Sequence, residues 1–500
     1  MSTERATTSD GNVADLRLHG GRVFLHGSGL VTADLLVTDG LVAGIVGADS
    51  PAQAREVVDL RGAVVLPGAI DPHVHLGKDI RTPKDPDDGD LETASAVAGG
   101  ITSMLVYLMS AEPYATEFAS SRKVMDEYSR TDFGFHFVLG TPQHLAEVPD
   151  YIRDLGVPTF KFFMNFRGDE GAYLGMPGND DAFMYDLLGI TADHGAMVNP
   201  HPENVELVWR LREQPRDESL GPLAAWNAAR PPFVEAEAQQ RVCYLASVTG
   251  ASVYAVHTSS RAALEATVRQ RAAYPNLYVE TCTHYLTLST ESACGTYGKV
   301  NPPLRPPSDV EALWEGLSAG EVDTVGSDHN ARHRSNKEKD IWSASAGFPG
   351  TGVVLPLTLA EGLRRGVSLD RIVDATSTRS AKLFGLYPDK GTIRVGSDAD
   401  LVVVDLDGST VLDGDTQHSA AAYTPWQGTQ VPVRVVHTLV RGTFAYRDGE
   451  LTDARPGRYL SRRRSGATAL AATDTATDTA TDTATDTATD IASGAKEGAR

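Results

Sequence analysis

The sequence of 500 residues is poor in cysteine and has only three, Cys243, Cys282 and Cys294. An odd number this small excludes a disulfide framework, and none of the three stands in the closely spaced pair that a thiolate zinc site requires. Because free thiols are typical of reducing compartments, the scarcity of cysteine favours a cytoplasmic protein.

Basic residues are also in deficit, with 45 Lys plus Arg against 66 Asp plus Glu and a formal net charge of −21. A chain with this charge has no bulk attraction for nucleic acid or for an anionic membrane surface. The sequence lacks an uninterrupted apolar run of about 18 residues, and its first residues contain no apolar signal core. We therefore expect no nucleic-acid partner, no membrane span and no export.

The remaining composition is that of an ordinary globular protein, with 41% hydrophobic and 22% charged residues. These fractions exclude a fibrous or mainly disordered chain and allow a sizeable buried core. A chain of this length builds several average domains, or one large barrel with a smaller companion.

Residues 465–500 differ from the rest of the chain in composition. Between residues 471 and 490 a four-residue Thr-Asp-Thr-Ala unit repeats. A helix here would stack aspartates four residues apart, and no apolar residue could offset the cost of ordering the segment. We expect a disordered C-terminal tail that carries no chemistry.

Short strand-like segments broken by Gly and Asp occur near both ends of the chain, in residues 13–65 and again in residues 389–455. This texture is typical of short antiparallel strands joined by tight turns. The two regions together predict one small β-sandwich domain assembled from both ends of the chain.

Between these regions, in residues 66–388, apolar strand-like runs alternate with helical stretches. Alternation of this kind indicates an α/β fold with a parallel sheet. The runs are 64–76, 101–108, 133–140, 159–164, 195–201, 251–257, 277–282 and 323–328. Eight of them predict a closed (β/α)8 TIM-type barrel, with its site where the strands end.

Side chains that can bind or activate a metal stand within or at the ends of these runs. They are His73 and His75 in the first run, Lys161 in the fourth, His201 in the fifth, His257 in the sixth and Asp328 in the eighth. His73 and His75 share one face of a strand, because residues two apart point the same way. Each residue alone could have an ordinary structural role. One shared metal site is a simpler hypothesis than a separate structural role for every one of them.

The motifs around these residues resemble those of metal-dependent amidohydrolases of the cyclic amidohydrolase group, which includes dihydropyrimidinases (hydantoinases), allantoinases and dihydroorotases. The matching segments are GAIDPHVHL, TFKFFM, VNPHPEN, YAVHTSS, VETCTHYL, KVNPPLR and TVGSDHN. The resemblance runs from about residue 14 to residue 450, and its overall pattern is most similar to dihydropyrimidinases and hydantoinases.

The resemblance implies a site with two divalent cations, zinc being the metal that this family usually carries. It implies that His73 and His75 bind one ion, that His201 and His257 bind the other, and that Lys161 bridges them as its carbamate. Asp328 would complete the first ion's ligands and act as general base and acid while a metal-bound hydroxide attacks the carbonyl of a cyclic amide. The resemblance also implies a homo-oligomer, a dimer or a tetramer.

Several departures from the family pattern concern the substrate. Dihydroorotases resembling this chain follow His-x-His with Leu-Arg, whereas here Leu76 precedes Gly77, which disfavours dihydroorotate. Hydantoinases of this kind carry an oxyanion-donating tyrosine where this chain has Phe166. Asn301 in the KVNPPLR segment and Phe166 are therefore candidate substrate-binding residues.

The segment after Asp328 carries two arginines, Arg332 and Arg334. Because guanidinium groups match carboxylate and phosphate, Arg332 or Arg334 is a candidate for binding an anionic substituent of the substrate. A deaminase or an acyclic amide hydrolase could be built on the same scaffold, as could a non-catalytic dihydropyrimidinase-like scaffold protein. Retention of all six ligand candidates argues against the non-catalytic protein.

Overall fold

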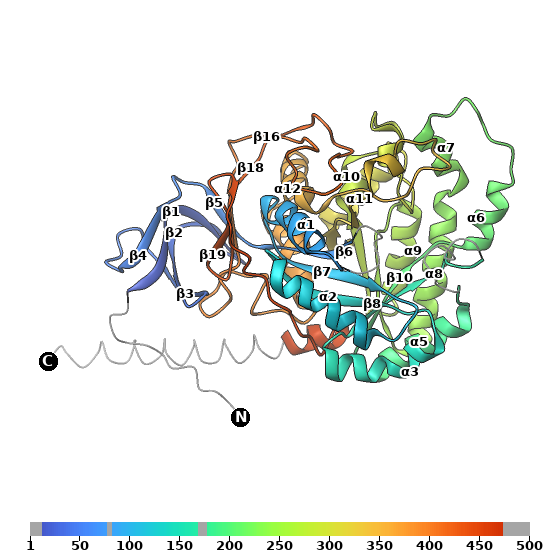
Figure 1. Cartoon of the computed structure of the whole chain (residues 1–500), viewed down its shortest axis with the longest axis horizontal. Helices are drawn as coiled ribbons and strands as arrows, with labels where there is room; N and C mark the ends of the chain where they lie inside the picture. Colours follow the sequence, from blue (N-terminus) through green and yellow to red (C-terminus); the bar gives the residue numbers. More distant parts are fainter. Residues whose placement is uncertain (1–12, 78–82, 169–177, 474–500) are drawn as a thin grey trace.

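The eight apolar runs form the strands of a parallel barrel in the computed structural model, which describes residues 13–77, 83–168 and 178–473 (Figure 1). The first seven strands pair in chain order, each with the next. They are β6 (Ala69–His75), β7 (Ile101–Met109), β8 (Asp132–Val138), β9 (Thr159–Phe163), β10 (Met197–His201), β11 (Ser252–Ala255) and β12 (Leu277–Cys282).

The eighth strand is broken into two pieces, and this break closes the barrel. β13 (Thr324–Gly326) pairs with β12, and β14 (His329–Asn330) pairs with β6, the first barrel strand. Ser327 and Asp328 lie between the two pieces. The predicted (β/α)8 barrel is confirmed, and its ring of hydrogen-bonded strands is complete.

Helices follow the strands and cover the outside of the barrel (Figure 1). The longer ones are α1 (Pro86–Ala98), α2 (Tyr114–Tyr128), α3 (Pro142–Asp150), α5 (Asp181–Asp193), α6 (Val205–Arg212), α7 (Pro222–Ala229), α8 (Pro232–Thr249), α9 (Arg261–Arg271), α11 (Pro307–Ala319) and α12 (Val354–Arg364). The short ones are α10 (Thr283–Thr287), α13 (Leu369–Val373) and α14 (Arg379–Leu383). No helix within the described ranges has the length and apolarity needed to cross a bilayer.

Local sequence explains where these helices begin. A proline stands at the first helical position of α1, α3, α7, α8 and α11, where the missing backbone N–H costs nothing. Elsewhere a polar side chain accepts the first free backbone N–H groups, as Asp180 does for α5 and Ser260 for α9.

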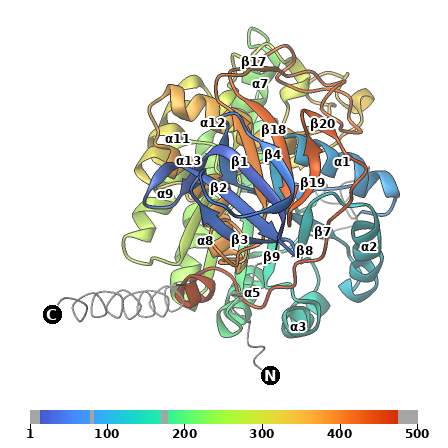
Figure 2. The ribbon, with the colours of Figure 1, turned by 90° about the vertical axis from the view of Figure 1, so that its left-hand side faces the viewer.

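Both chain ends contribute to a smaller β domain beside the barrel, which faces the viewer in Figure 2. Its sheet follows the order β20-β19-β18-β15-β5-β1-β2-β3, with β4 paired to β1. The strands are β1 (Ala14–Leu25), β2 (Gly29–Thr38), β3 (Leu41–Val46), β4 (Ala54–Asp59), β5 (Val64–Pro67), β15 (Leu401–Asp405), β18 (Arg434–Val440), β19 (Thr443–Arg447) and β20 (Glu450–Leu451). A separate pair, β16 (Thr410–Val411) and β17 (Gln430–Val431), follows β15 in the chain.

The first predicted strand, residues 64–76, serves both domains. Its beginning is β5 in the small sheet and its remainder is β6 in the barrel. Gly68 joins the two, and a Cβ there would lie 2.2 Å from Oγ1 of Thr102, so only glycine fits without a shift. Leu16, Leu35, Leu401 and Leu439 belong to one apolar core, which joins the two chain ends.

The beginning of the predicted tail packs against the barrel. Ser465 is buried and its hydroxyl donates to the carbonyl of Pro158, while the N–H of Gly466 donates to the carbonyl of Leu383. Residues 467–473 are helical, and Ala469 is buried. A boundary at residue 465 is therefore too early, because these contacts order the segment, and residues 474–500 lie outside the described residues.

A buried lysine links the β domain to the barrel. Lys390 is 2% exposed, and its Nζ lies 2.7 Å from Oδ2 of Asp132, 3.0 Å from Oδ2 of Asp398 and 2.5 Å from Oδ2 of Asp400. Asp132 begins barrel strand β8, whereas Asp398 and Asp400 directly precede β15. One cation therefore pairs with carboxylates from both domains.

Replacing Lys390 by methionine should lower the free energy of unfolding by about 3–5 kcal/mol, because buried carboxylates lose their shared cation. Urea unfolding followed by circular dichroism measures this change. Arg394→Met is the matched control, since Arg394 is exposed and its side chain makes no ion pair among the described residues. Equal stability of the two variants would contradict the structural role of Lys390.

Candidate metal centre

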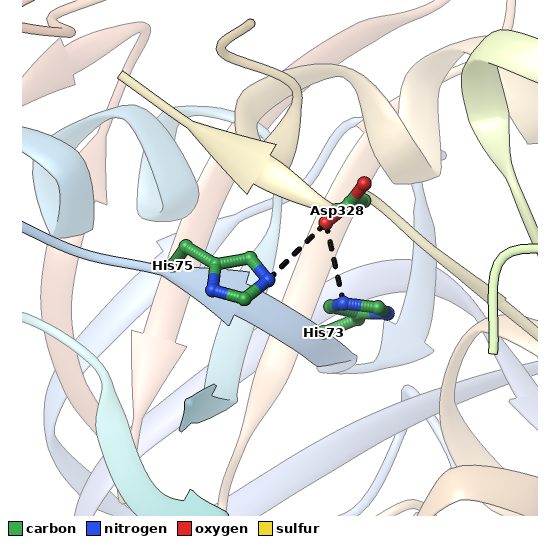
Figure 3. Close-up of side chains that lie close together, drawn as sticks. All are labelled: His73, His75 and Asp328. Atoms are coloured by element: carbon green, nitrogen blue, oxygen red, sulfur yellow. Dashed lines mark ion pairs between the residues drawn. The ribbon is translucent and has the colours of Figure 1, made fainter. Parts of the chain in front are cut away.

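The two histidines of β6 point into the mouth of the barrel toward Asp328 (Figure 3). Nε2 of His73 lies 3.2 Å from Oδ1 of Asp328, and Nε2 of His75 lies 3.4 Å from the same oxygen. One ligand atom from each of the three residues lies within 4.8 Å of the others. Burial lowers the pKa of His75 to about 4, so its imidazole is neutral near pH 7.

Asp328 stands at the break in the eighth strand and has a φ of 48°. This left-handed backbone conformation is uncommon for a residue other than glycine and turns the chain sharply after β13. Burial alone would raise the pKa of Asp328, but the charges of His73 and Lys161 and the hydrogen bond from His75 hold it well below its ordinary value. Asp328 is therefore a carboxylate that can accept a proton.

Lys161 lies in β9 and is 1% exposed. Its Nζ lies 5.0 Å from the ring centroid of Tyr107 and 5.1 Å from that of Phe163, and it makes no hydrogen bond or ion pair within the described part of the chain. Burial lowers the pKa of Lys161 to about 8, although Asp328 and Glu280 oppose the shift. The shift raises the neutral fraction of this amine near neutral pH, where the ammonium form still predominates.

His201 ends β10 and is oriented by a buried ion pair. Its Nε2 lies 2.7 Å from Oε2 of Glu203, and the same oxygen accepts a hydrogen bond of 2.7 Å from Arg230. Burial opposes ionisation of Glu203, but Arg230 and the hydrogen bond from His201 outweigh it and bring the pKa of Glu203 to about 2. Glu203 thus remains charged and fixes the imidazole ring of His201.

His257 follows β11 and has a φ of 42°. Its ring centroid lies 4.5 Å from that of His201 and 5.5 Å from that of His73. Both ring nitrogens are buried, and neither has a hydrogen-bond partner among the residues described. Such an imidazole is costly in a protein interior unless another group, such as a metal ion, binds it.

Glu280 on β12 contacts both His73 and His257. Its Oε1 lies 2.8 Å from Nδ1 of His73 and accepts a hydrogen bond of 3.1 Å from the backbone N–H of His257. A carboxylate on Nδ1 leaves Nε2 of His73 as the nitrogen that faces Asp328. The donor set as a whole, with neutral imidazoles, a carboxylate and a buried amine, fits divalent cations.

A cavity of about 90 Å³ opens above these groups. Five of the six predicted ligands line it, and the sixth, His73, contacts Asp328. Phe166, Asn301 and Arg332, the predicted substrate-binding residues, also line it. The structure therefore brings these nine residues to one end of the barrel, whereas Arg334, the alternative to Arg332, does not line the cavity.

Sequence reasoning missed three polar residues of this region: Asn165, Asn330 and Glu280. Asn165 and Asn330 line the cavity and are 3% and 7% exposed. Asn165 directly follows the run that contains Lys161, so its position just beyond the end of β9 was the available signal. Glu280 had no such signal, because it lies inside the apolar strand β12.

Comparison with known proteins places this centre in a family. The chain is 33% identical over 453 residues to an L-hydantoinase from Paenarthrobacter aurescens, a match that covers 88% of this chain and 96% of the relative. A model described as the amidohydrolase family matches residues 245–445, which include His257 and Asp328. The chain belongs to the amidohydrolase family.

Other members of the amidohydrolase family match over similar lengths. An allantoinase from Deinococcus radiodurans is 34% identical over 455 residues, covering 88% of this chain and 99% of the relative. The solved structure of a D-hydantoinase from a Bacillus species aligns with a TM-score of 0.81 and 31% identity, covering 90% of this chain and 99% of that one. The resemblance drawn from the sequence motifs is thus confirmed.

Proposed function

We propose that the protein is a metal-dependent hydrolase that opens the ring of a cyclic amide or ureide, of the dihydropyrimidine, hydantoin or allantoin type. The convergence of six ligand-type side chains from several barrel strands carries this proposal, since five of them line one cavity and the sixth, His73, contacts Asp328. The names of the relatives, hydantoinase and allantoinase, support this substrate class.

In this proposal His73, His75, His201 and His257 would hold two divalent cations, with zinc as the first metal to test. Lys161, as its carbamate, and Asp328 would complete the ligand set. When bound, the cations would lower the pKa of a water molecule and polarise the scissile carbonyl. The neutral imidazole of His75 and the unpartnered nitrogens of His257 support these assignments.

Asp328 has the central part in proton transfer. As water adds to the ring carbonyl, the Asp328 carboxylate accepts a proton from it, and the new C–O bond forms. Asp328 then returns this proton to the ring nitrogen as the C–N bond breaks. The depressed pKa of Asp328 favours the carboxylate form in which this cycle starts.

Asp328→Asn should lower kcat by at least about 100-fold, because a positioned general acid and base contributes about 10²–10⁴. The assay measures ring opening of dihydrouracil, hydantoin, allantoin and dihydroorotate by zinc-loaded protein in bicarbonate. Asp193→Asn, at an exposed position of α5, is the control. Metal content of both variants is measured in parallel, and full activity of Asp328→Asn at normal metal content would overturn the proposed role.

Glu280→Gln should weaken zinc binding by about 10- to 100-fold, because groups that orient a ligating histidine typically contribute this much. Competition with a chromophoric chelator measures the affinity without any reaction. Glu291→Gln, at an exposed site, serves as the matched control. Unchanged zinc affinity of Glu280→Gln would contradict the assignment of His73 as a ligand.

Asn165 supplies a hydrogen-bond donor that Phe166 cannot. The ring of Phe166 stacks on Phe163 with centroids 4.0 Å apart and has no polar hydrogen. The neighbouring amide of Asn165 is 97% buried, lines the cavity and makes no hydrogen bond within the described ranges. We assign this amide to the substrate carbonyl oxygen, which becomes more negative in the transition state.

Asn165→Ala should lower kcat by about 10²–10³-fold, the usual effect of removing one oxyanion donor. The value of KM should change far less, because the donor acts mainly on the transition state. Asn179→Ala is the control, since Asn179 does not line the cavity. A rise in KM at unchanged kcat would show instead that Asn165 only holds the ground-state substrate.

We further propose that the enzyme works in the cytoplasm as a dimer or a tetramer of identical subunits. Its three cysteines are free, which is consistent with a reducing compartment. Size-exclusion chromatography with light scattering measures the number of subunits.

A further inference from the structure

Arg332 is an unpaired guanidinium at the edge of the proposed active site. It follows the strand β14 and lines the cavity together with Asp328, Asn301 and Asn330. Its Nε is buried without a hydrogen-bond partner, and the side chain makes no ion pair within residues 13–77, 83–168 and 178–473. The residue is partly exposed, and arginine offers five N–H donors, so its unpartnered Nε leaves a donor that a bound molecule can satisfy.

Arg334, two residues later, is engaged elsewhere. Its Nε donates to Oε1 of Glu338 at 3.0 Å and to the hydroxyl of Tyr297 at 3.2 Å. The side chain is 54% exposed and does not line the cavity. Of the two arginines that the sequence left open, only Arg332 is available to a bound molecule.

The segment that carries Arg332 is held in place by a buried lysine. Nζ of Lys337 donates to the backbone carbonyls of Lys299, Ser345 and Gly347 at 2.9, 2.8 and 2.9 Å. These bonds tie the segment to the rest of the cavity wall. No carboxylate pairs with Lys337 in the part of the chain that is described, so these backbone carbonyls hold its ammonium group.

The same cavity also has an apolar part. Met109, Phe163 and Phe166 contribute to its lining, and the two phenylalanine rings stack at an interplanar angle of 6°. An apolar aromatic wall suits the flat face of a ring, whereas a free guanidinium suits an anion.

Resting on the proposed function, we infer that the preferred substrate is a cyclic amide with an anionic arm, such as a carboxylate, and that Arg332 binds this arm. The ring lies against Phe163 and Phe166 with its carbonyl toward Asp328. The arm extends to the guanidinium and forms a charge-assisted, bidentate hydrogen bond with it. Arg332 is thus a specificity-determining residue.

Three hydantoins that differ only in the arm at ring carbon 5 test this inference: carboxyethyl, carboxamidoethyl and propyl. Zinc-loaded wild type should favour the carboxylate over the carboxamide by about 10- to 100-fold in kcat/KM, the range expected of a charged hydrogen bond. Arg332→Met should bring this ratio close to one. Arg334→Met, the matched control in the same segment, should keep the ratio of the wild type.

A binding measurement separates this inference from the proposed function. Calorimetric titration of Asp328→Asn, with and without the further change Arg332→Met, reports affinity for the three compounds without turnover. Ring opening without preference for the carboxylate overturns the inference and leaves the function standing. Tighter, Arg332-dependent binding of the carboxylate without any ring opening supports the anion site and overturns the function. Equal weakening of all three compounds by Arg332→Met assigns Arg332 a structural role and overturns the inference.

Discussion

Closure of the barrel through its broken eighth strand is the constraint on which the centre depends. β13 ends its pairing with β12, and β14 begins a new pairing with β6 only two residues later. Asp328 occupies this break, so the turn that closes the barrel also directs its carboxylate to His73 and His75. In an open sheet the first and last strands would stand at opposite edges, and these residues could not meet.

Burial then sets the protonation states of the groups that closure gathers. Removal from water keeps His75 neutral and lowers the pKa of Lys161, while neighbouring positive charge keeps Asp328 ionised. Each of these states is the one that a divalent cation or a carbamate requires. Glu280 and Glu203 orient two of the histidines, because each carboxylate forms a hydrogen bond with one imidazole ring. Glu280 bonds to His73, and Glu203 bonds to His201.

Much of this arrangement could be predicted from the sequence, because barrel strands are continuous apolar runs and their ends share one edge. The roles of side chains that lie inside the strands or beyond their ends were harder to predict. Glu280 interrupts an apolar strand, and only the closed interior makes its inner-face carboxylate a buried partner of His73. The sequence alone does not distinguish Arg332 from Arg334 as the arginine that faces the cavity. The structure does, because Arg334 bonds to Tyr297, which is distant in the chain.

In the proposed function, reaction chemistry and substrate choice reside in different parts of the molecule. The proposed ligands stand on or beside strands that the whole barrel holds in register, so a change there disturbs the sheet itself. Arg332 stands on a segment that Lys337 anchors by donating hydrogen bonds to backbone carbonyls. Backbone carbonyls are present whatever side chains the residues carry. Residues in that segment can change without loss of the strand pairing. Relatives named hydantoinase and allantoinase belong to the same family. In the proposed function, a change in such a segment would alter which ring substituent the cavity accepts without altering how the ring is opened.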